Sequence, residues 1–109
     1  ALSGYDTVFV DTVTSYTLTS NVEALDLLNT HDVLTINGAG NSLANTITGN
    51  GLANRLSGMD GNDEIKGEDG HDSLIGGSGA DTLFGGRGND TLIGDQIFVT
   101  SSLDGNDIL

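Results

Sequence analysis

The chain has 109 residues, of which 16 are acidic and 3 are basic, so its formal net charge is −13. Such a chain repels nucleic acid and anionic membranes and attracts multivalent cations. It has no cysteine, which excludes disulfides and thiolate metal sites. No apolar run approaches the roughly 18 residues that span a bilayer. We therefore expect no nucleic-acid partner and no membrane insertion. An acidic chain can also be merely soluble or disordered, so the positions of its carboxylates matter.

The segment 1–39 is irregular in spacing but rich in strand-forming side chains. Residues 7–10 (TVFV) and 33–36 (VLTI) combine β-branched and aromatic residues, which favours short strands. A solenoid needs ends that do not expose a bare sheet edge. We therefore expect residues 1–39 to form irregular β-coil that caps the repeats that follow.

Glycine recurs every nine residues through the middle of the chain, which indicates a repeat architecture. Position 1 of the repeat is this glycine: Gly40, Gly49, Gly58, Gly67, Gly76, Gly85 and Gly94. Position 4 is leucine twice and then glycine: Leu43, Leu52, Gly61, Gly70, Gly79 and Gly88. Position 6 is asparagine twice and then aspartate: Asn45, Asn54, Asp63, Asp72, Asp81 and Asp90. Position 8 is always aliphatic: Ile47, Leu56, Ile65, Leu74, Leu83 and Leu92.

Each repeat divides into a six-residue turn and a three-residue strand. Glycine at positions 1 and 4 permits backbone conformations that are closed to residues with a Cβ, and lets carbonyl oxygens converge. In the strand, position 8 points inward and positions 7 and 9 point outward, because side chains alternate. Two repeats make one full coil, and coils stack about 4.8 Å apart as parallel strands. The sequence therefore predicts an all-β parallel β-roll, a solenoid with two repeats per coil and a core too thin to hold it alone.

From residue 58 the units read GMDGNDEIK, GEDGHDSLI, GGSGADTLF and GGRGNDTLI. They resemble the repeats-in-toxin (RTX) nonapeptide G-G-x-G-x-D-x-U-x of haemolysin-type calcium-binding β-rolls, where U is a large aliphatic residue. The resemblance is specific over residues 58–93 and partial over residues 40–57. It implies Ca²⁺ as the cofactor, with carbonyl oxygens of the turns completing each site.

Aspartates one coil apart should lie above one another. Asp63 is then above Asp81, and Asp72 is above Asp90. Stacked carboxylates repel unless a cation lies between them, and hard oxygen ligands suit Ca²⁺. The alternative is that these aspartates only cap the turns, as Asx residues often do.

The predicted calcium residues come from positions 1, 3 and 6 of the units from residue 58, with one later aspartate. They are Gly58, Asp60, Asp63, Gly67, Asp69, Asp72, Gly76, Ser78, Asp81, Gly85, Arg87, Asp90 and Asp107. Asn45 and Asn54 offer a neutral oxygen but no charge, so we expect their turns to bind calcium weakly or not at all.

After Gly94 the rhythm breaks, and residues 103–109 (LDGNDIL) resume the motif with Asp107 at position 6. The step from Asp90 to Asp107 is one residue short of a full coil, so Asp107 can still stack near Asp90. Residues 3–8 (SGYDTV) resemble the tail of one more repeat with Asp6 at position 6, so the chain starts and stops inside a repeat, which indicates a fragment of a longer protein. The chain thus divides into a capping segment (1–39), the β-roll (40–94, calcium-rich from residue 58) and an interrupted, truncated repeat (95–109).

Other chemistry finds little support in the sequence. Asp60, Asn62 and Glu64 have the spacing of an EF-hand loop, but Ile65 stands where its glycine should be. Two isolated histidines make neither a zinc site nor a catalytic pair. No catalytic constellation is present, so we expect no enzymatic activity in this chain.

The resemblance implies a calcium-responsive folding module of a larger secreted or cell-surface bacterial protein, exported by a type I system. Its partners would be calcium ions and neighbouring modules of the parent protein. The alternative function is a carbohydrate-binding accessory module, as in alginate epimerases, which would use basic and aromatic side chains along one face. The basic residues Arg55, Lys66 and Arg87 form no obvious stripe.

Position 9 points outward, yet it is apolar in three successive repeats. Ile75 and Ile93 should stack on one sheet, and Phe84 should lie on the other. Isolated apolar residues on a surface are common and need no explanation. The alternative is a small patch that supports weak self-association.

Overall fold

The computed structural model describes residues 4–10, 15–27, 37–94 and 96–100. All regular elements in these ranges are β-strands: β1 (Thr7–Val10), β2 (Ser15–Thr17), β3 (Ala24–Leu27), β4 (Asn37–Ala39), β5 (Thr46–Thr48), β6 (Arg55–Ser57), β7 (Glu64–Lys66), β8 (Ser73–Ile75), β9 (Ala80–Phe84), β10 (Thr91–Ile93) and β11 (Gln96–Thr100). The described residues contain no helical segment with the length and hydrophobicity needed to cross a bilayer.

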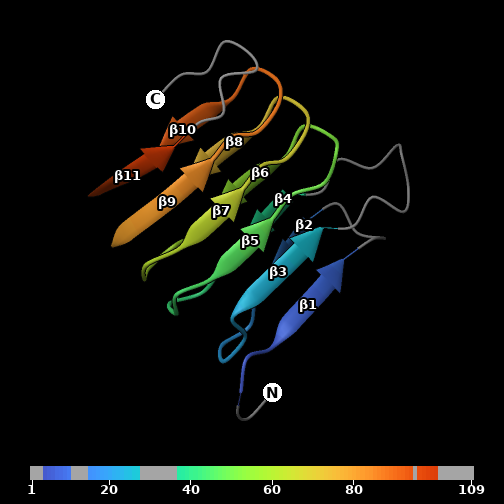
Figure 1. Cartoon of the computed structure of the whole chain (residues 1–109). Helices are drawn as coiled ribbons and strands as arrows, with labels where there is room; N and C mark the ends of the chain where they lie inside the picture. Colours follow the sequence, from blue (N-terminus) through green and yellow to red (C-terminus); the bar gives the residue numbers. More distant parts are fainter. Residues whose placement is uncertain (1–3, 11–14, 28–36, 95, 101–109) are drawn as a thin grey trace.

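The strands form two parallel sheets. One sheet has the order β1-β3-β5-β7-β9-β11 and the other has the order β2-β4-β6-β8-β10. Figure 1 shows the odd-numbered strands as the near layer and the even-numbered strands behind them, with the chain advancing from blue to red along the stack. Because successive strands alternate between the sheets and all pairs are parallel, the chain is a coiled solenoid. The predicted parallel β-roll is confirmed.

The register of the central strands follows the predicted coil. Ile47 of β5 pairs with Ile65 of β7, and Ile65 pairs with Leu83 of β9, so each partner lies two repeats further along the chain. The coils nearer the N-terminus belong to the same sheets, but they contain a different number of residues from the two-repeat coils. Ala24 pairs with Thr7 before it, across slightly less than two repeats, and with Thr46 after it, across more than two repeats. The predicted segment boundary at residue 39 stays a prediction.

The core is a column one side chain wide on each sheet. The aliphatic side chains at position 8 are buried to 2% exposure or less: Ile47, Leu56, Ile65, Leu74, Leu83 and Leu92. Leu25 and Leu27 of β3 extend the column toward the N-terminus. Gly38 of β4 faces Leu25, and a Cβ there would lie 2.7 Å from a methyl carbon of that side chain. A column this thin buries little apolar surface per residue, so the fold depends strongly on how its turns are held.

The outer faces carry the apolar residues that the sequence placed there. Ile75 and Ile93 are paired partners on β8 and β10, as predicted, and Ile93 is 53% exposed. Phe84 lies on β9 of the other sheet, also as predicted. The role of this patch in self-association stays a prediction.

The last described strand departs from the two-repeat period. Thr82 of β9 pairs with Phe98 of β11, a step shorter than two repeats. The interruption that the sequence shows after Gly94 is therefore a shortened coil whose strand still extends the sheet. Asp107, the last predicted calcium residue, lies outside the described residues.

Candidate metal centre

The turns of residues 58–94 share one backbone pattern. Position 4 is left-handed, with φ between 96° and 114°: Gly61, Gly70, Gly79 and Gly88. Position 2 is left-handed as well, with φ between 74° and 90°: Met59, Glu68, Gly77 and Gly86. The position 1 glycines have no positive φ. The predicted special backbone angle is therefore confirmed for position 4 and absent at position 1, where glycine serves the other predicted purpose, the convergence of carbonyl oxygens.

Met59 holds a left-handed conformation that is costly for a residue with a Cβ, by roughly 1 kcal/mol or more. Glycine removes this cost but loses more entropy on folding. We therefore expect Met59→Gly to raise the free energy of unfolding in calcium by up to about 1 kcal/mol. Urea unfolding measures it. Met59→Ala trims the same exposed side chain but keeps the Cβ, and should bring no gain. Equal stability of the two variants would contradict the prediction.

Glycine at position 1 leaves room for oxygen atoms. A Cβ on Gly58 would lie 2.6 Å from the carbonyl oxygen of Gly76, one coil further on, and against the carboxylate of Asp63. Gly67 stands in the same surroundings on the opposite edge of the roll. A carboxylate oxygen and a main-chain carbonyl oxygen from the next coil thus converge beside the glycine Cα, where only a hydrogen atom fits.

The aspartates at position 6 link successive coils. Asp63 Oδ1 accepts the N–H of Asn45 at 2.7 Å, and Asp81 Oδ1 accepts the N–H of Asp63 at 2.9 Å. On the opposite edge, Asp90 Oδ1 accepts the N–H of Asp72 at 2.8 Å. The predicted vertical stacking is therefore present, and one oxygen of each carboxylate is held in place by the preceding coil.

The second carboxylate oxygen has no such partner at Asp63 or Asp72. Both side chains are buried, at 3% and 2% exposure, and the two Oδ2 atoms accept no hydrogen bond. Burial raises the pKa of Asp63 to about 7, against the lowering effect of the Asn45 N–H, and the charges of Asp81 and Asp60 raise it further. An ionised carboxylate here is poorly compensated by the protein alone.

Asp72 is in the same situation on the other edge. Burial raises its pKa to about 7, although the N–H of Asn54 lowers it, and the neighbouring charges of Asp90, Asp69 and Glu68 raise it again. Each edge of the roll therefore holds a buried carboxylate with other negatively charged side chains close to it. A cation between the turns would remove this repulsion.

A family model for the RTX calcium-binding nonapeptide repeat, in four copies, matches residues 39–74, 48–83 and 66–96. These stretches overlap and together span more than half of the chain. The chain belongs to the RTX calcium-binding repeat family. No curated protein and no solved structure matches it. The resemblance seen in the four units from residue 58 is thereby confirmed.

The geometry of the RTX turns fits calcium. The Oδ2 atoms of Asp63 and Asp72 are buried without a donor, and the space beside each position 1 glycine is lined by oxygen. No three His, Asp or Glu side chains of the described residues cluster as a metal site, so carbonyl oxygens such as that of Gly76 must supply further ligands. Asp63 with Asp81, and Asp72 with Asp90, would hold the ions. Bound Ca²⁺ would supply positive charge between the stacked RTX turns.

At position 3, which was also predicted to bind calcium, the side chains are exposed: Asp60, Asp69, Ser78 and Arg87. Their main chains join the stacked turns, since the N–H of Ser78 donates to the carbonyl of Met59 at 2.9 Å. Asp69 and Arg87 form an isolated parallel bridge in the same way. In an RTX turn these residues can therefore contribute main-chain oxygens, and their ligand role stays a prediction.

The sequence did not lead us to predict a role for the two asparagines at position 2, Asn41 and Asn50. Asn45 Oδ1 accepts the N–H of Asn41 at 2.8 Å, and Asn54 Oδ1 accepts the N–H of Asn50 at 2.9 Å. The signal was present, because the first two repeats share G-N-x-L-A-N at residues 40–45 and 49–54. These pairs distinguish the first two turns from the acidic RTX turns.

Proposed function

We propose that this chain is a calcium-dependent folding module whose acidic coils, residues 58–94, assemble when Ca²⁺ binds between stacked turns. One observation carries the proposal. The Oδ2 atoms of Asp63 and Asp72 are buried beside oxygen-lined glycine positions and have no hydrogen-bond donor. The protein places two negative charges where only a cation stabilises them.

The balance of charge and core explains why folding would need the ion. Residues 58–94 contain eight acidic and two basic residues, a net charge of −6. Against this repulsion stands a single column of aliphatic side chains, which cannot offset the conformational entropy that folding removes. Where a binding site does not exist in the unfolded chain, the free energy of metal binding becomes free energy of folding.

Calcium titration followed by circular dichroism tests the proposal. We expect little β-structure from residues 58–94 in chelator and a cooperative gain on adding calcium, with midpoints in the extracellular range of about 10⁻⁴ to 10⁻³ M. Magnesium at the same concentration is the control, since Mg²⁺ demands a stricter geometry and should fold the chain poorly. A β-signal that is complete in chelator and unchanged by calcium would refute the proposal.

We further propose that the module is part of a larger secreted or cell-surface protein that leaves the cell by a type I system, and that the module itself is not catalytic. Membership of the RTX family supports the first part, together with a folding reaction that suits a change from low to high calcium. Neighbouring modules of the parent protein would then be its partners. Expression of the chain with and without a type I exporter, followed by assay of the medium, tests the route.

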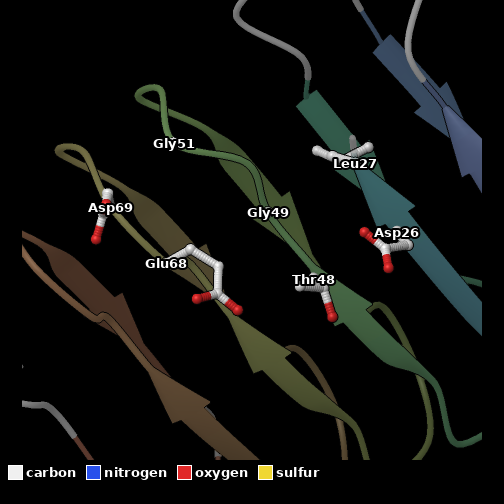
Figure 2. A pocket seen from close by; sticks show the side chains of 7 residues that line it. All are labelled: Asp26, Leu27, Thr48, Gly49, Gly51, Glu68 and Asp69. Carbon is white, nitrogen blue, oxygen red and sulfur yellow. The ribbon is translucent and has the colours of Figure 1, made fainter. Parts of the chain in front are cut away.

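Binding of an acidic glycan is not favoured at the hollow that Asp26 and Glu68 flank. An open hollow of the sheet that contains β3, β5 and β7 is lined by the ends of β3 and β5 and by the turns after β5 and β7. It is flanked by carboxylates, and Figure 2 shows Asp26 and Glu68 with Thr48 between them. Burial raises the pKa of Asp26, and no basic side chain is among the described residues that line the hollow. Lys66 on this sheet pairs with Glu64 at 3.3 Å. An acidic glycan would be repelled here.

A further inference from the structure

In the first two turns of the β-roll, the buried oxygen of the position 6 side chain accepts a hydrogen bond from the protein itself and needs no ion. The amide oxygen of Asn45 lies against Gly40 as the carboxylate of Asp63 lies against Gly58. This oxygen accepts the N–H of Asn41 at 2.8 Å. In the acidic turns, the corresponding oxygen of Asp63 is buried with no hydrogen bond.

The side chains of the position 2 asparagines also accept hydrogen bonds from the main chain of the same turns. Asn41 Oδ1 accepts the N–H of Leu43 at 2.9 Å, and Asn50 Oδ1 accepts the N–H of Leu52 at 3.0 Å. Neither asparagine has a positive φ, whereas position 2 of the acidic turns does. These turns are therefore Asx turns, built from side-chain hydrogen bonds that take the place of the left-handed conformation.

The asparagine amides also fasten this turn to the coil before it. Asn41 Nδ2 donates to the carbonyls of Thr19 at 2.8 Å and Val22 at 2.7 Å. Asn45 Nδ2 donates to the carbonyls of Val22 at 3.1 Å and Glu23 at 3.3 Å. A carboxylate has no such donor, so the bonds from Asn45 Nδ2 to the preceding coil exist only because position 6 is an amide here.

The charge of the segment agrees with this neutral chemistry. Residues 37–57 contain no acidic residue and one arginine, whereas residues 58–94 have a net charge of −6. Asn45, Asn50 and Asn54 are buried to 3% exposure or less, and no atom of theirs is among the buried, unsatisfied polar atoms of the described residues. Fully satisfied buried polar groups rigidify a structure.

We propose that the asparagine turns keep the coils up to residue 57 folded without calcium, and that this part is the template on which the acidic coils assemble. The template offers the next coil its free sheet edges at β5 and β6. It also offers the N–H groups of Asn45 and Asn54, which Asp63 and Asp72 accept at 2.7 and 2.8 Å. Assembly then proceeds from the N-terminal side. The inference rests on the proposed function only for the behaviour of residues 58–94.

Hydrogen exchange of the complete chain, read by mass spectrometry, tests the inference. In chelator, peptides within residues 37–57 should exchange at least about tenfold more slowly than an unfolded chain, while peptides within residues 58–94 should be unprotected. In calcium both groups should be protected. Asn45→Asp removes the Nδ2 donors and adds a carboxylate, so residues 37–57 should lose protection in chelator and regain it in calcium. Asn41→Ala should lose it in chelator as well. Ser42→Ala, at an exposed position of the same turn, should change nothing.

Two results would overturn the inference. One is rapid exchange of residues 37–57 in chelator in the unmodified chain. The other is protection in chelator that survives both Asn45→Asp and Asn41→Ala. Protection of residues 58–94 in chelator would instead count against calcium-dependent folding. In that case, the loss or survival of protection of residues 37–57 in the two variants would still test whether the asparagine turns hold the template together.

Discussion

Asp72→Asn should change stability in opposite directions with and without calcium. In chelator near pH 8, where residues 58–94 of the original chain are expected to be largely unfolded, the variant should lower the free energy of the folded acidic coils by roughly 1–4 kcal/mol and so increase their β-signal. In calcium, the affinity of the site between the Asp72 and Asp90 turns should fall on the order of tenfold to a hundredfold. A side chain that serves only as a turn cap would not produce this reversal.

The reversal follows from what asparagine keeps and what it removes. In the original chain the N–H of Asn54 donates to Asp72 Oδ1 at 2.8 Å, and the amide oxygen of an asparagine at position 72 can still accept this bond. The negative charge disappears, and with it the cost of burying an ionised carboxylate, which raises the pKa of Asp72 most, and the repulsion from Asp90, which raises it further. A nitrogen in place of Oδ2 can donate to a nearby carbonyl, but it cannot bind a cation.

Two measurements report the two effects: circular dichroism in chelator, with an added osmolyte that favours burial and so populates the folded coils, and calorimetric titration with calcium. Glu64→Gln is the matched control, because it removes one negative charge from the same coils at a half-exposed strand position paired with Lys66. The control should shift both quantities only slightly, as expected for a surface ion pair. A weaker β-signal of Asp72→Asn than of the original chain in chelator, or an unchanged calcium affinity, would contradict the prediction.

Acid should partly replace calcium in holding the acidic coils together. The pKa values of Asp63 and Asp72 are raised by burial from 3.8 to about 7 in the folded chain. Between these values the folded state binds protons that the unfolded state does not, so without calcium its stability increases as pH falls. The gain is complete below the unfolded value near 3.8 and is lost as pH rises through about 7.

Calcium binding has the opposite dependence, because its carboxylate ligands must lose their protons. Below pH 7 the apparent affinity should fall by up to about tenfold per pH unit for each proton released per ion. Circular dichroism in chelator at pH 8 and pH 5 should show more β-structure at pH 5. Calorimetry at pH 6.5 in two buffers of different ionisation enthalpy counts the protons that calcium releases.

The double variant Asp63→Asn with Asp72→Asn identifies the groups responsible. It should lose most of the pH dependence in chelator, since both raised pKa values belong to the replaced carboxyls. If the double variant keeps the full pH response, the general charge of the acidic coils, rather than these two groups, controls it.

The repeat made most of the fold predictable. Period nine, an aliphatic position 8 and alternation within three-residue strands together require Leu56 and Leu74 to stack on one sheet, and they do. The stacking of Asp63 and Asp81 follows from the same arithmetic, because a fixed coil length converts sequence spacing into a vertical column. Where the period holds, position in the sequence and position in space are nearly the same information.

The remainder depends on local chemistry that a period does not encode. The coils on either side of Ala24 contain different numbers of residues, and strand propensity does not predict how many residues connect two strands. The left-handed angle of Met59 is invisible because the residue type opposes it. Asn41 was not predicted because its turn was compared only with the acidic pattern, whereas the G-N-x-L-A-N repeat is a pattern of its own.

The direction of the sheet pairing has a mechanical consequence. Within each sheet, an inner strand pairs with the strand one coil before and the strand one coil after, so the ladder hydrogen bonds lie along the length of the stack. Tension between the two ends of the stack would therefore break the hydrogen bonds between one pair of neighbouring strands at a time. It would not act on all strand pairs at once. Each opening in the central part releases one two-repeat coil of slack and can close again when the tension drops. A protein anchored through such a stack would be tethered by an extensible element whose resistance depends on the ion content of the surrounding medium.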